Sequence, residues 1–249
     1  MRNSIGEFRE GLLIAFTAIR ANKMRSVLTA IGIIIGIVSV TLMGTAIEGL
    51  NRAFNKSIAA IGADVLYVQK WPWGGGDEWW KIRNRRELRL QQAKVLEKQA
   101  ELARSVSPMM GAGRNVRYAR KLLEGITVIG TNSDFLVTSG VNMAFGRFFT
   151  AAESDGGRPV CAIGSEVAME LFPNESPLGK TIKVGSYNYK VVGVLEKQGI
   201  FLGMQSLDNR LYLPINRFVK EFASRRSNVT IMVKAISLKE IDEAKEEVR

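Results

Sequence analysis

The feature that most constrains this chain is an apolar segment near its N-terminus. Residues 27–47 form a run of 21 side chains without a single charge. As a helix with a rise of 1.5 Å per residue, the run would be about 30 Å long, which matches the hydrocarbon core of a bilayer. It therefore predicts a membrane-spanning helix. A cleaved signal peptide is the alternative, but the apolar part of such a peptide is usually about 7–15 residues long.

The charges on either side of this segment predict its orientation. Arg20, Lys23 and Arg25 precede it, and an acidic residue follows it. Basic residues stay on the cytoplasmic side of membrane helices, so we expect a cytoplasmic N-terminus. Residues 1–24 carry apolar side chains at steps of three and four, which predicts an amphipathic helix in the cytoplasmic interface. The alternative is a core helix of a small cytoplasmic domain, for which so short a leader is insufficient.

Two further features of the predicted membrane helix concern its packing and its length. Gly32 and Gly36 form a Gly-x-x-x-Gly pattern, which lets a second helix, in this chain or another, approach closely. Glycine is also common in membrane helices without such a role. Apolar residues continue at helical spacing to Ile61, so we expect one helix over residues 25–61. It would be roughly 55 Å long and would leave the bilayer as a stiff stalk.

Residues 62–249 predict an extracytoplasmic domain of the α+β class. Short strands and short helices interleave irregularly, unlike the regular pattern of a doubly wound sheet. About 185 residues suffice for one hydrophobic core or for two small subdomains. We expect a hairpin around Gly185 and a helix over residues 86–104. The other expected strands cover residues 63–70, 126–130, 160–164 and 228–233, and the other expected helices cover residues 165–172, 216–222 and 237–248.

Two stretches of this domain have an unusual composition. Trp71, Trp73, Trp79 and Trp80 fall within ten residues, in a loop interrupted by proline and glycine. Tryptophan favours membrane interfaces and protein contacts, so the loop contacts a partner or lipid, or it folds back onto its own domain. Residues 81–121 carry twelve basic and three acidic side chains. A solvated surface is the first interpretation and a contact with anionic lipid or a partner the second, while an extracytoplasmic location disfavours nucleic acid.

The residue types also restrict the chemistry. The chain has no histidine and one cysteine, Cys161. Histidine-based triads, intrachain disulfides and His- or Cys-based metal sites are therefore excluded. Residues 174–181 end in Gly-Lys-Thr like a phosphate-binding loop, but Asn174 replaces the first glycine, Pro177 lacks an N–H donor, and the motif follows a helix. We expect no enzyme activity, no cofactor and no metal, and a buried structural role for Cys161.

Two stretches of the sequence carry a resemblance to a known family. Residues 15–43 resemble the opening of permease subunits of bacterial ABC transporters of the MacB, LolC/E and FtsX type, with a basic elbow before a membrane helix rich in glycine and isoleucine. Residues 159–199 are similar to the periplasmic core domain of that family, with the motifs at 171–173, 176–180 and 192–194 in the usual order. The resemblance covers nearly the whole chain except the tryptophan-rich loop.

This resemblance implies a location, a mechanism and a set of partners. Such permeases lie in the bacterial inner membrane and pair as dimers beside cytosolic ABC ATPase subunits, in some cases with a periplasmic adaptor protein. ATP binding closes the ATPases, the membrane helices shift, and the stalks move the periplasmic domains. ATP hydrolysis would then belong to a separate ATPase subunit. The family normally has three more membrane helices after the periplasmic domain, so the chain resembles the N-terminal part of a truncated permease.

Two other functions fit the same residues. One is a stand-alone, single-pass protein that binds or senses a ligand with its periplasmic domain, and this function would need no further helices. The other is a membrane-tethered enzyme, which would need an exposed serine or carboxylate as its catalytic group. No nucleophile-elbow or Ser-x-x-Lys pattern indicates such a group.

Overall fold

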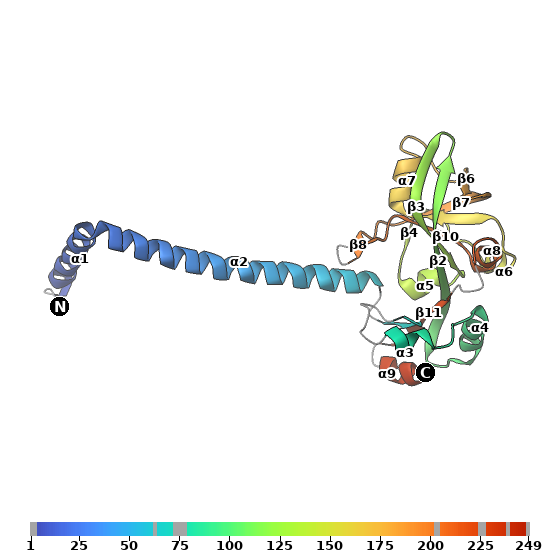
Figure 1. Cartoon of the computed structure of the whole chain (residues 1–249), viewed down its shortest axis with the longest axis horizontal. Helices are drawn as coiled ribbons and strands as arrows, with labels where there is room; N and C mark the ends of the chain where they lie inside the picture. Colours follow the sequence, from blue (N-terminus) through green and yellow to red (C-terminus); the bar gives the residue numbers. More distant parts are fainter. Residues whose placement is uncertain are drawn as a thin grey trace. The chain divides into compact units, whose positions relative to one another are not determined.

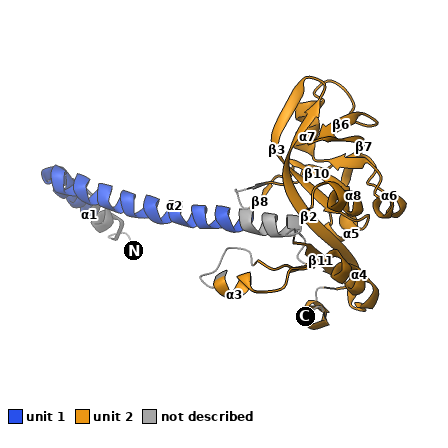
Figure 2. Cartoon of the chain, turned by 45° about the vertical axis from the view of Figure 1, so that its right-hand side comes forward, with its two compact units in different colours: residues 1–55 blue, residues 56–249 orange. Residues whose placement is uncertain are grey.

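The structure of the chain is a computed structural model that describes residues 4–61, 64–71, 79–201, 205–223, 228–237 and 240–247. The chain divides into two compact units, residues 1–55 and residues 56–249 (Figure 2). The first unit is helical and the second is a mixed α/β domain. This arrangement confirms the expected fold class, a long N-terminal helix followed by an α+β domain.

In the described part of the first unit, two helices follow each other closely (Figure 1). These are α1, Ser4–Ala21, and α2, Lys23–Ile61, whose last turns belong to the second unit. The backbone of Asn22, between them, stays hydrogen-bonded on both sides. Its N–H donates to the Ala18 carbonyl at 3.3 Å, and its carbonyl accepts from the Ser26 N–H at 3.1 Å. The turn between the helices therefore leaves few backbone groups without a partner.

The threonine side chains within α2 are hydrogen-bonded inside the helix. The Thr29 hydroxyl donates to the Arg25 carbonyl at 2.9 Å, and the Thr41 hydroxyl donates to the Ile37 carbonyl at 2.8 Å. In a hydrocarbon environment an unpartnered hydroxyl would cost free energy, so these bonds make threonine compatible with a membrane span. By length and composition, the stretch from Lys23 to Arg52 can cross a membrane.

Among its described residues, the second unit holds a nine-stranded sheet and a separate two-stranded hairpin, β8–β9 (Figure 1). The strand order is β1-β11-β2-β3-β10-β5-β7-β4, and β6 pairs with both β2 and β7. The strands are β1 (Val65–Val68), β2 (Ala103–Tyr118), β3 (Lys121–Thr131), β4 (Met143–Gly146), β5 (Val160–Ile163), β6 (Thr181–Val184), β7 (Tyr187–Leu195), β8 (Ile200–Phe201), β9 (Gln205–Ser206), β10 (Arg210–Pro214) and β11 (Thr230–Ala235). The helices are α3 (Trp79–Arg83), α4 (Leu90–Gln99), α5 (Phe135–Ser139), α6 (Ala151–Asp155), α7 (Ser165–Leu171), α8 (Ile215–Glu221) and α9 (Ile241–Glu247).

Six of these strands close into a ring. Going round it, β2 pairs with β3, β3 with β10, β10 with β5, β5 with β7, β7 with β6, and β6 with β2 again. The closing step is short, with Val116 opposite Val184 and Arg117 opposite Lys183. A closed ring leaves no long unpaired edge, so its backbone groups bond within the domain.

The long strand β2 joins the ring to the rest of the sheet. Its first part pairs with β11 over Ala103–Met109, and its second part pairs with β3 from Met110 to Tyr118. The outer partner of β11 is β1. The second unit therefore contains a three-stranded sheet, β1-β11-β2, and a six-stranded ring, and the two share one strand, while the ninth strand, β4, pairs with β7 outside the ring.

Side chains alternate between two hydrophobic clusters along the central strands. In β10, Leu211 and Leu213 belong to one cluster, and Tyr212 between them belongs to the other. This alternation follows from the two-residue period of a strand, which sends neighbouring side chains to opposite faces. Both faces of β10 are therefore buried from Leu211 onward, and this explains why the strand is apolar after Arg210.

The structure corrects one expected element and confirms others. The helix expected over residues 86–104 is wrong: α4 covers only Leu90–Gln99, and β2 begins at Ala103. Ala100 has extended backbone angles and ends α4, because the following residues pair with β11. The hairpin around Gly185 is confirmed, and this glycine supplies a positive φ of 58° at the turn between β6 and β7.

Candidate functional site

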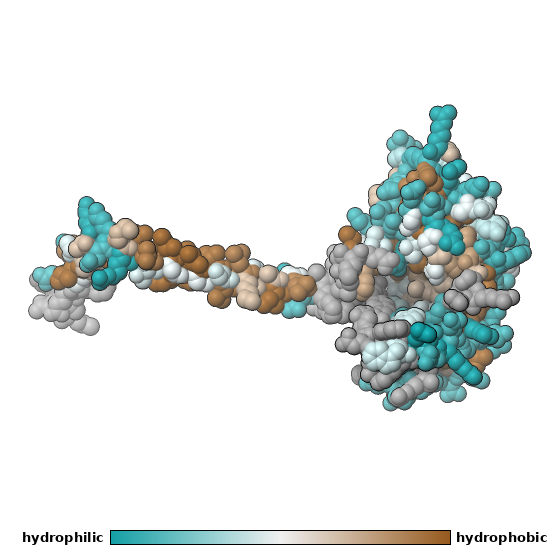
Figure 3. All heavy atoms as spheres, viewed as in Figure 1, coloured by the Kyte–Doolittle hydropathy of each residue, from teal (hydrophilic) through white to brown (hydrophobic). Residues whose placement is uncertain are grey.

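The first candidate site is the apolar surface of the N-terminal helices. The large apolar side chains described in α1 and α2 are 48–79% exposed. Figure 3 shows apolar residues along most of the visible length of α2. Water disfavours a continuous apolar surface of this length, whereas the hydrocarbon core of a bilayer accommodates it. This surface is therefore a candidate membrane span.

The second candidate site is the basic corner where α1 meets α2. Arg20, Lys23 and Arg25 are all exposed there. A shallow groove of about 510 Å³ lies at this corner, lined by Phe16, Ile19, Arg20, Lys23, Ser26, Val27 and Ala30. The mixture of apolar and cationic side chains is typical of a helix at a membrane interface. The structure thus brings Arg20 and Lys23 together, while the orientation they would set stays a prediction.

The glycine pair in α2 lies on an open surface. Gly32 and Gly36 are one turn apart, and a Cβ atom added to either residue would meet nothing within 4 Å. Neither glycine is therefore explained by a neighbour within the described chain. Close packing against another helix stays a prediction for this pair.

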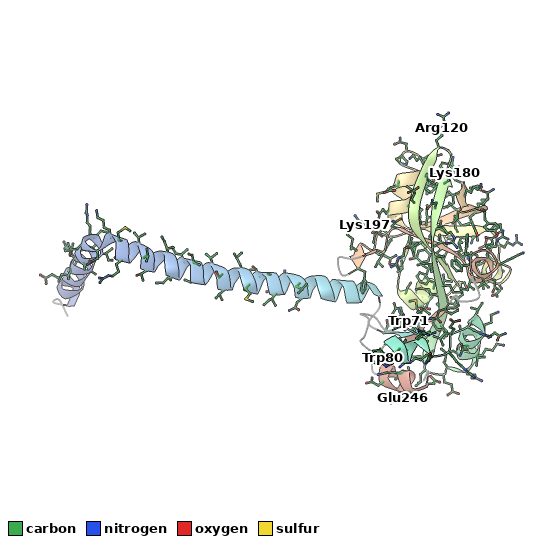
Figure 4. All side chains as sticks on the ribbon, viewed as in Figure 1. Trp71, Trp80, Arg120, Lys180, Lys197 and Glu246 are labelled. Atoms are coloured by element: carbon green, nitrogen blue, oxygen red, sulfur yellow. The ribbon has the colours of Figure 1, made fainter. Side chains whose placement is uncertain are left out.

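The tryptophan-rich loop is described in part. Trp71 is 48% exposed, and the Lys70 ammonium lies over its ring at 5.8 Å from the centroid. Trp80 lies on α3 and is 54% exposed. Trp73 and the side chain of Trp79 lie outside the described residues. Figure 4 shows Trp71 and Trp80 at the same end of the second unit, so two large aromatic side chains are exposed there.

A cleft lined mainly by cationic side chains lies beside these tryptophans. It has a volume of about 720 Å³, and we call it the arginine cleft. Its lining residues are Lys70, Arg83, Arg85, Arg86, Glu87, Arg89, Gln91 and Gln92. Trp71 directly follows Lys70, and Trp80 lies on the same short helix as Arg83. The cleft therefore combines five cations with one carboxylate and is flanked by exposed aromatic residues.

Buried residues hold the walls of the arginine cleft in place. Ile82 anchors α3 at 8% exposure, and Ala93 anchors α4 at 2% exposure. Between the helices, the Leu88 N–H donates to the Asn228 side-chain oxygen at 3.0 Å, and the Leu88 carbonyl accepts from the Val229 N–H at 3.2 Å. The segment that carries the arginines is thus attached to the strand region before β11.

The basic stretch 81–121 does not form one surface. Its first part lines the arginine cleft, and its last part forms the turn between β2 and β3. Figure 4 places Arg120, in that turn, at the opposite end of the second unit from Trp71. Sequence reasoning treated the stretch as one basic region and so missed this separation, which comes from the strand β2.

The Gly-Lys-Thr sequence belongs to a turn before β6. The Gly179 N–H donates to the Val191 carbonyl at 2.8 Å, and the Lys180 N–H donates to the Pro177 carbonyl at 3.2 Å. The Lys180 ammonium pairs with the Glu175 carboxylate at 2.6 Å. The groups that would cradle a phosphate therefore already have partners in the chain.

The single thiol is enclosed by the ring. Cys161 lies in β5 with no exposed surface, and burial raises the pKa of its thiol. A reactive cysteine needs exposure and a thiolate form, which this environment opposes. Among the described residues, no group of three or more acidic or sulfur ligands could hold a metal ion.

Sequence reasoning missed a buried carboxylate at the base of the hairpin β8–β9. Asp208 is 5% exposed, and its side chain accepts hydrogen bonds from the Gln198 N–H at 2.7 Å and the Gly199 N–H at 2.9 Å. Nearby, the Ser206 hydroxyl donates to Glu166 at 2.6 Å. No local pattern marks this residue in the sequence, because its neighbours Ser206, Asn209 and Arg210 are polar. These bonds hold the base of the hairpin in place, which is a structural role.

Known proteins are similar to this chain in both sequence and fold. The chain is 29% identical over 211 residues to the macrolide export ATP-binding/permease protein MacB of Bdellovibrio bacteriovorus, covering 85% of this chain and 32% of that protein. It is 27% identical over 232 residues to the pyoverdine export ATP-binding/permease protein PvdT of Pseudomonas aeruginosa, covering 92% of this chain and 34% of that protein. The chain thus spans about a third of the length of these relatives.

A solved structure shows the same fold in the second unit. The crystal structure of the periplasmic region of MacB from Actinobacillus actinomycetemcomitans matches with a TM-score of 0.64 at 21% identity, over 77% of this chain and 83% of that one. The family model of the MacB-like periplasmic core domain matches residues 26–249. This domain is part of a permease and is distinct from the ATP-binding part that the relatives' names also mention. The chain therefore belongs to the family of the MacB-like periplasmic core domain.

Proposed function

We propose that this chain is the first membrane helix and the periplasmic domain of a bacterial ABC transporter permease, and that it transmits movement from the membrane to the periplasm. Its N-terminus would lie in the cytoplasm, and residues 62–249 would lie outside the inner membrane. The observation that carries the proposal is α2, one helix of 39 residues from Lys23 to Ile61 in a chain that matches the family from residue 26. An unbroken helix transmits rotation and displacement without loss at a flexible joint.

The domain is suited to receive such movement as one body. Only three residues separate the end of α2 at Ile61 from the start of β1 at Val65. β1 bonds to β11, and β11 bonds to the shared strand β2. A displacement of β1 would therefore pass through continuous backbone hydrogen bonds to the ring.

A buried polar cluster strengthens this connection at β2. The Ser107 hydroxyl donates to the Asn132 side-chain oxygen at 2.7 Å and lies 2.8 Å from the Thr138 hydroxyl. The Ser105 hydroxyl lies 2.6 Å from the same Thr138 oxygen. These bonds tie the first half of β2 to α5 and to the residue after β3, so the two sheets resist sliding against each other.

The proposed partners follow from the family. A cytosolic ABC ATPase would bind and hydrolyse ATP, a second permease chain would pack against Gly32 and Gly36, and a periplasmic adaptor protein would extend the path outward. The names of the relatives combine ATP binding and permease in one protein. The ATPase would accordingly lie on a separate subunit or on a joined domain. One relative is named for macrolides and another for pyoverdine, so the substrate class is not part of the proposal.

The proposal is tested by native purification followed by a coupling assay. We expect the protein, tagged and isolated from its own membranes, to bring down an ATP-hydrolysing subunit or domain. A fluorophore on Arg120→Cys would then report ATP-dependent movement, because the buried native thiol does not react with the dye. We expect Asn51→Pro to abolish this signal and to spare ATP hydrolysis, because proline breaks the helix beyond the apolar segment.

Asn51→Ala is the matched control and should keep both the signal and the hydrolysis, since alanine preserves the helix. A native complex without any ATP-hydrolysing component would contradict the proposal and favour a single-pass sensor. An unchanged signal in Asn51→Pro would contradict the role of α2 in transmission.

A further inference from the structure

We propose that the arginine cleft binds the phosphate headgroup of an anionic membrane lipid. The inference rests on the membrane anchoring of this chain and on the second unit's own geometry, and it needs no ATPase or transported substrate. Nothing in the match to the family assigns a role to this cleft.

The first argument is the balance of charge. Five cationic side chains and one carboxylate line the cleft. Within the part of the chain that the structure describes, Arg85, Arg86 and Arg89 have no ion-pair partner for their side chains. Cations gathered in a concave surface repel one another and concentrate a positive potential there. An anion in the cleft would relieve this repulsion, and the planar guanidinium group matches the oxygens of a phosphate in pairs.

The second argument is that the cleft is already assembled. Ile82 and Ala93 are buried below its two helical walls, and Leu88 is bonded to Asn228 and Val229 between them. The backbone of Arg89 is also held, because its N–H donates to the Gln92 side-chain oxygen at 2.8 Å. Binding of a ligand would therefore cost conformational entropy mainly at the ends of the arginine side chains.

The third argument selects a lipid over an acidic protein. Trp71 and Trp80 are about half exposed at the same end of the second unit (Figure 4), and Lys70, which precedes Trp71, lines the cleft. Indole rings favour the headgroup layer of a bilayer, and clusters of arginine and lysine favour anionic lipids. The lining is polar, so it suits a headgroup and does not suit an acyl chain.

The chain offers a built-in probe for the test. All four tryptophans fall within residues 71–80, so intrinsic fluorescence reports on this region alone. We would insert the full chain into nanodiscs of phosphatidylcholine and add phosphatidylglycerol in steps, with a nitroxide quencher on a fraction of the headgroups. We expect anionic lipid to shift tryptophan emission to the blue and to increase quenching. Salt at high concentration should reverse both effects, because it screens exposed charges.

The decisive variant is the double charge reversal Arg85→Glu with Arg86→Glu. A surface cation contributes roughly a fivefold change in affinity for anionic lipid, so the concentration of anionic lipid needed for half of the effect should rise by at least about 25-fold. The matched control reverses two exposed cations away from the cleft, Arg120→Glu with Lys197→Glu, and changes the net charge equally. It should behave like the wild type. The milder pair Arg85→Gln with Arg86→Gln should give an intermediate result, and circular dichroism checks the folding of each variant.

Three outcomes would overturn the assignment. An equal response to both lipids would exclude recognition of the anionic headgroup. Equal losses in the cleft variant and in the control would show a general effect of charge. The same blue shift with soluble glycerol phosphate in phosphatidylcholine discs would make a free phosphate the ligand. Membrane insertion is measured separately by co-sedimentation of the nanodiscs, so failed anchoring is distinguished from an unoccupied cleft.

Discussion

The two units of this chain differ in how far their large apolar side chains are exposed. In the first unit, the described large apolar side chains are 48–79% exposed, while in the second unit residues such as Leu211 and Ile163 have no exposed surface. The second unit thus forms a buried hydrophobic core by itself, as a domain in water must. The first unit leaves the same residue types for another environment to cover. The contrast teaches that the apolar surface of the first unit suits a different environment from the water that the second unit is built for.

The glycines show the same contrast at single positions. A Cβ on Gly164, at the end of β5, would collide with the backbone carbonyl of Asp208. The folded domain itself therefore requires this glycine. A Cβ on Gly36 in α2 would meet nothing. No described neighbour requires a glycine at this position, so its surface is open to the proposed second helix.

The largest expected effect comes from a substitution in the core of the second unit. Phe218 on α8 is 1% exposed and packs against Gly130. We expect Phe218→Ala to lower the free energy of unfolding of the domain by about 3–5 kcal/mol, because it leaves a cavity. Urea unfolding followed by circular dichroism measures this loss. The matched change Phe16→Ala, at a residue 70% exposed on α1, should leave the same transition in place. A similar loss in both variants would contradict the contrast between the units.

The next effect tests this difference in environment directly. Ile35 in α2 and Ile200 in β8 are similarly exposed, at 58% and 64%. We expect Ile35→Arg to weaken membrane insertion by about 2.5–3.5 kcal/mol, since an arginine would lie near the middle of the bilayer. Ile200→Arg should have no such effect. The fraction of protein that resists carbonate extraction measures insertion. If both variants stayed in the membrane equally well, α2 would not be the membrane span.

A smaller effect is expected at the glycine pair. Replacing Gly32→Leu and Gly36→Leu together should weaken self-association in detergent or lipid by about tenfold, which corresponds to about 1.4 kcal/mol, because the backbones could no longer approach closely. Thr41→Leu, on the opposite side of the helix, serves as the control. Analytical ultracentrifugation of the full chain measures the association. Unchanged association in the glycine variant would contradict the proposed helix contact, but it would not contradict the proposed membrane span.

The smallest expected effect is the loss of one ion pair in the second unit, which depends on pH. In the second unit, the Arg147 guanidinium pairs with the Glu153 carboxylate at 2.6 and 2.8 Å and, as the main cause, lowers the pKa of Glu153 to about 2. The unfolded pKa of glutamate is about 4.3, so this stabilisation is present above pH 4.5 and is lost as the pH falls towards 2. Arg147 is about half exposed, so we expect only about 0.5–1 kcal/mol.

Unfolding of the domain in urea at pH 6 and at pH 2.5 measures this contribution. Arg147→Gln should destabilise the domain at pH 6 and have little effect at pH 2.5. An equal loss at both values would show that packing of the arginine, and not its charge pair, is responsible. The membrane helix should show no corresponding pH dependence.

The sequence predicted the elements whose signals are local. The run of uncharged residues predicted α2, because a membrane span needs only length and apolarity. The glycine between β6 and β7 predicted their hairpin, because the turn requires a positive φ there. The domain boundaries stated for the sequence, at residues 24/25 and 61/62, stay predictions.

The sequence could not predict features that depend on distant pairing. β2 contains Pro108 and several glycine and basic residues, so its composition does not resemble a strand, and its partners β11 and β6 lie far along the chain. The arginine cleft was equally hidden. Its basic residues were visible, but the end of the helix at Gln99 separates them from the basic residues of the β2–β3 turn. Long-range hydrogen bonds outweighed the local helical pattern in both cases.

Under the proposed function, the length of the shared strand β2 would also set how far the domain amplifies a movement. A strand of 16 residues measures up to about 50 Å. Because β2 begins beside β11 and ends at the turn that carries Arg120, under the proposed function it would act as a lever arm with its fulcrum in the three-stranded sheet (Figure 1). With such an arm, a rotation of about 5° at the fulcrum moves the tip by about 4 Å. A slight tilt at the β1 end would become a stroke large enough to open or close a gap between neighbouring molecules.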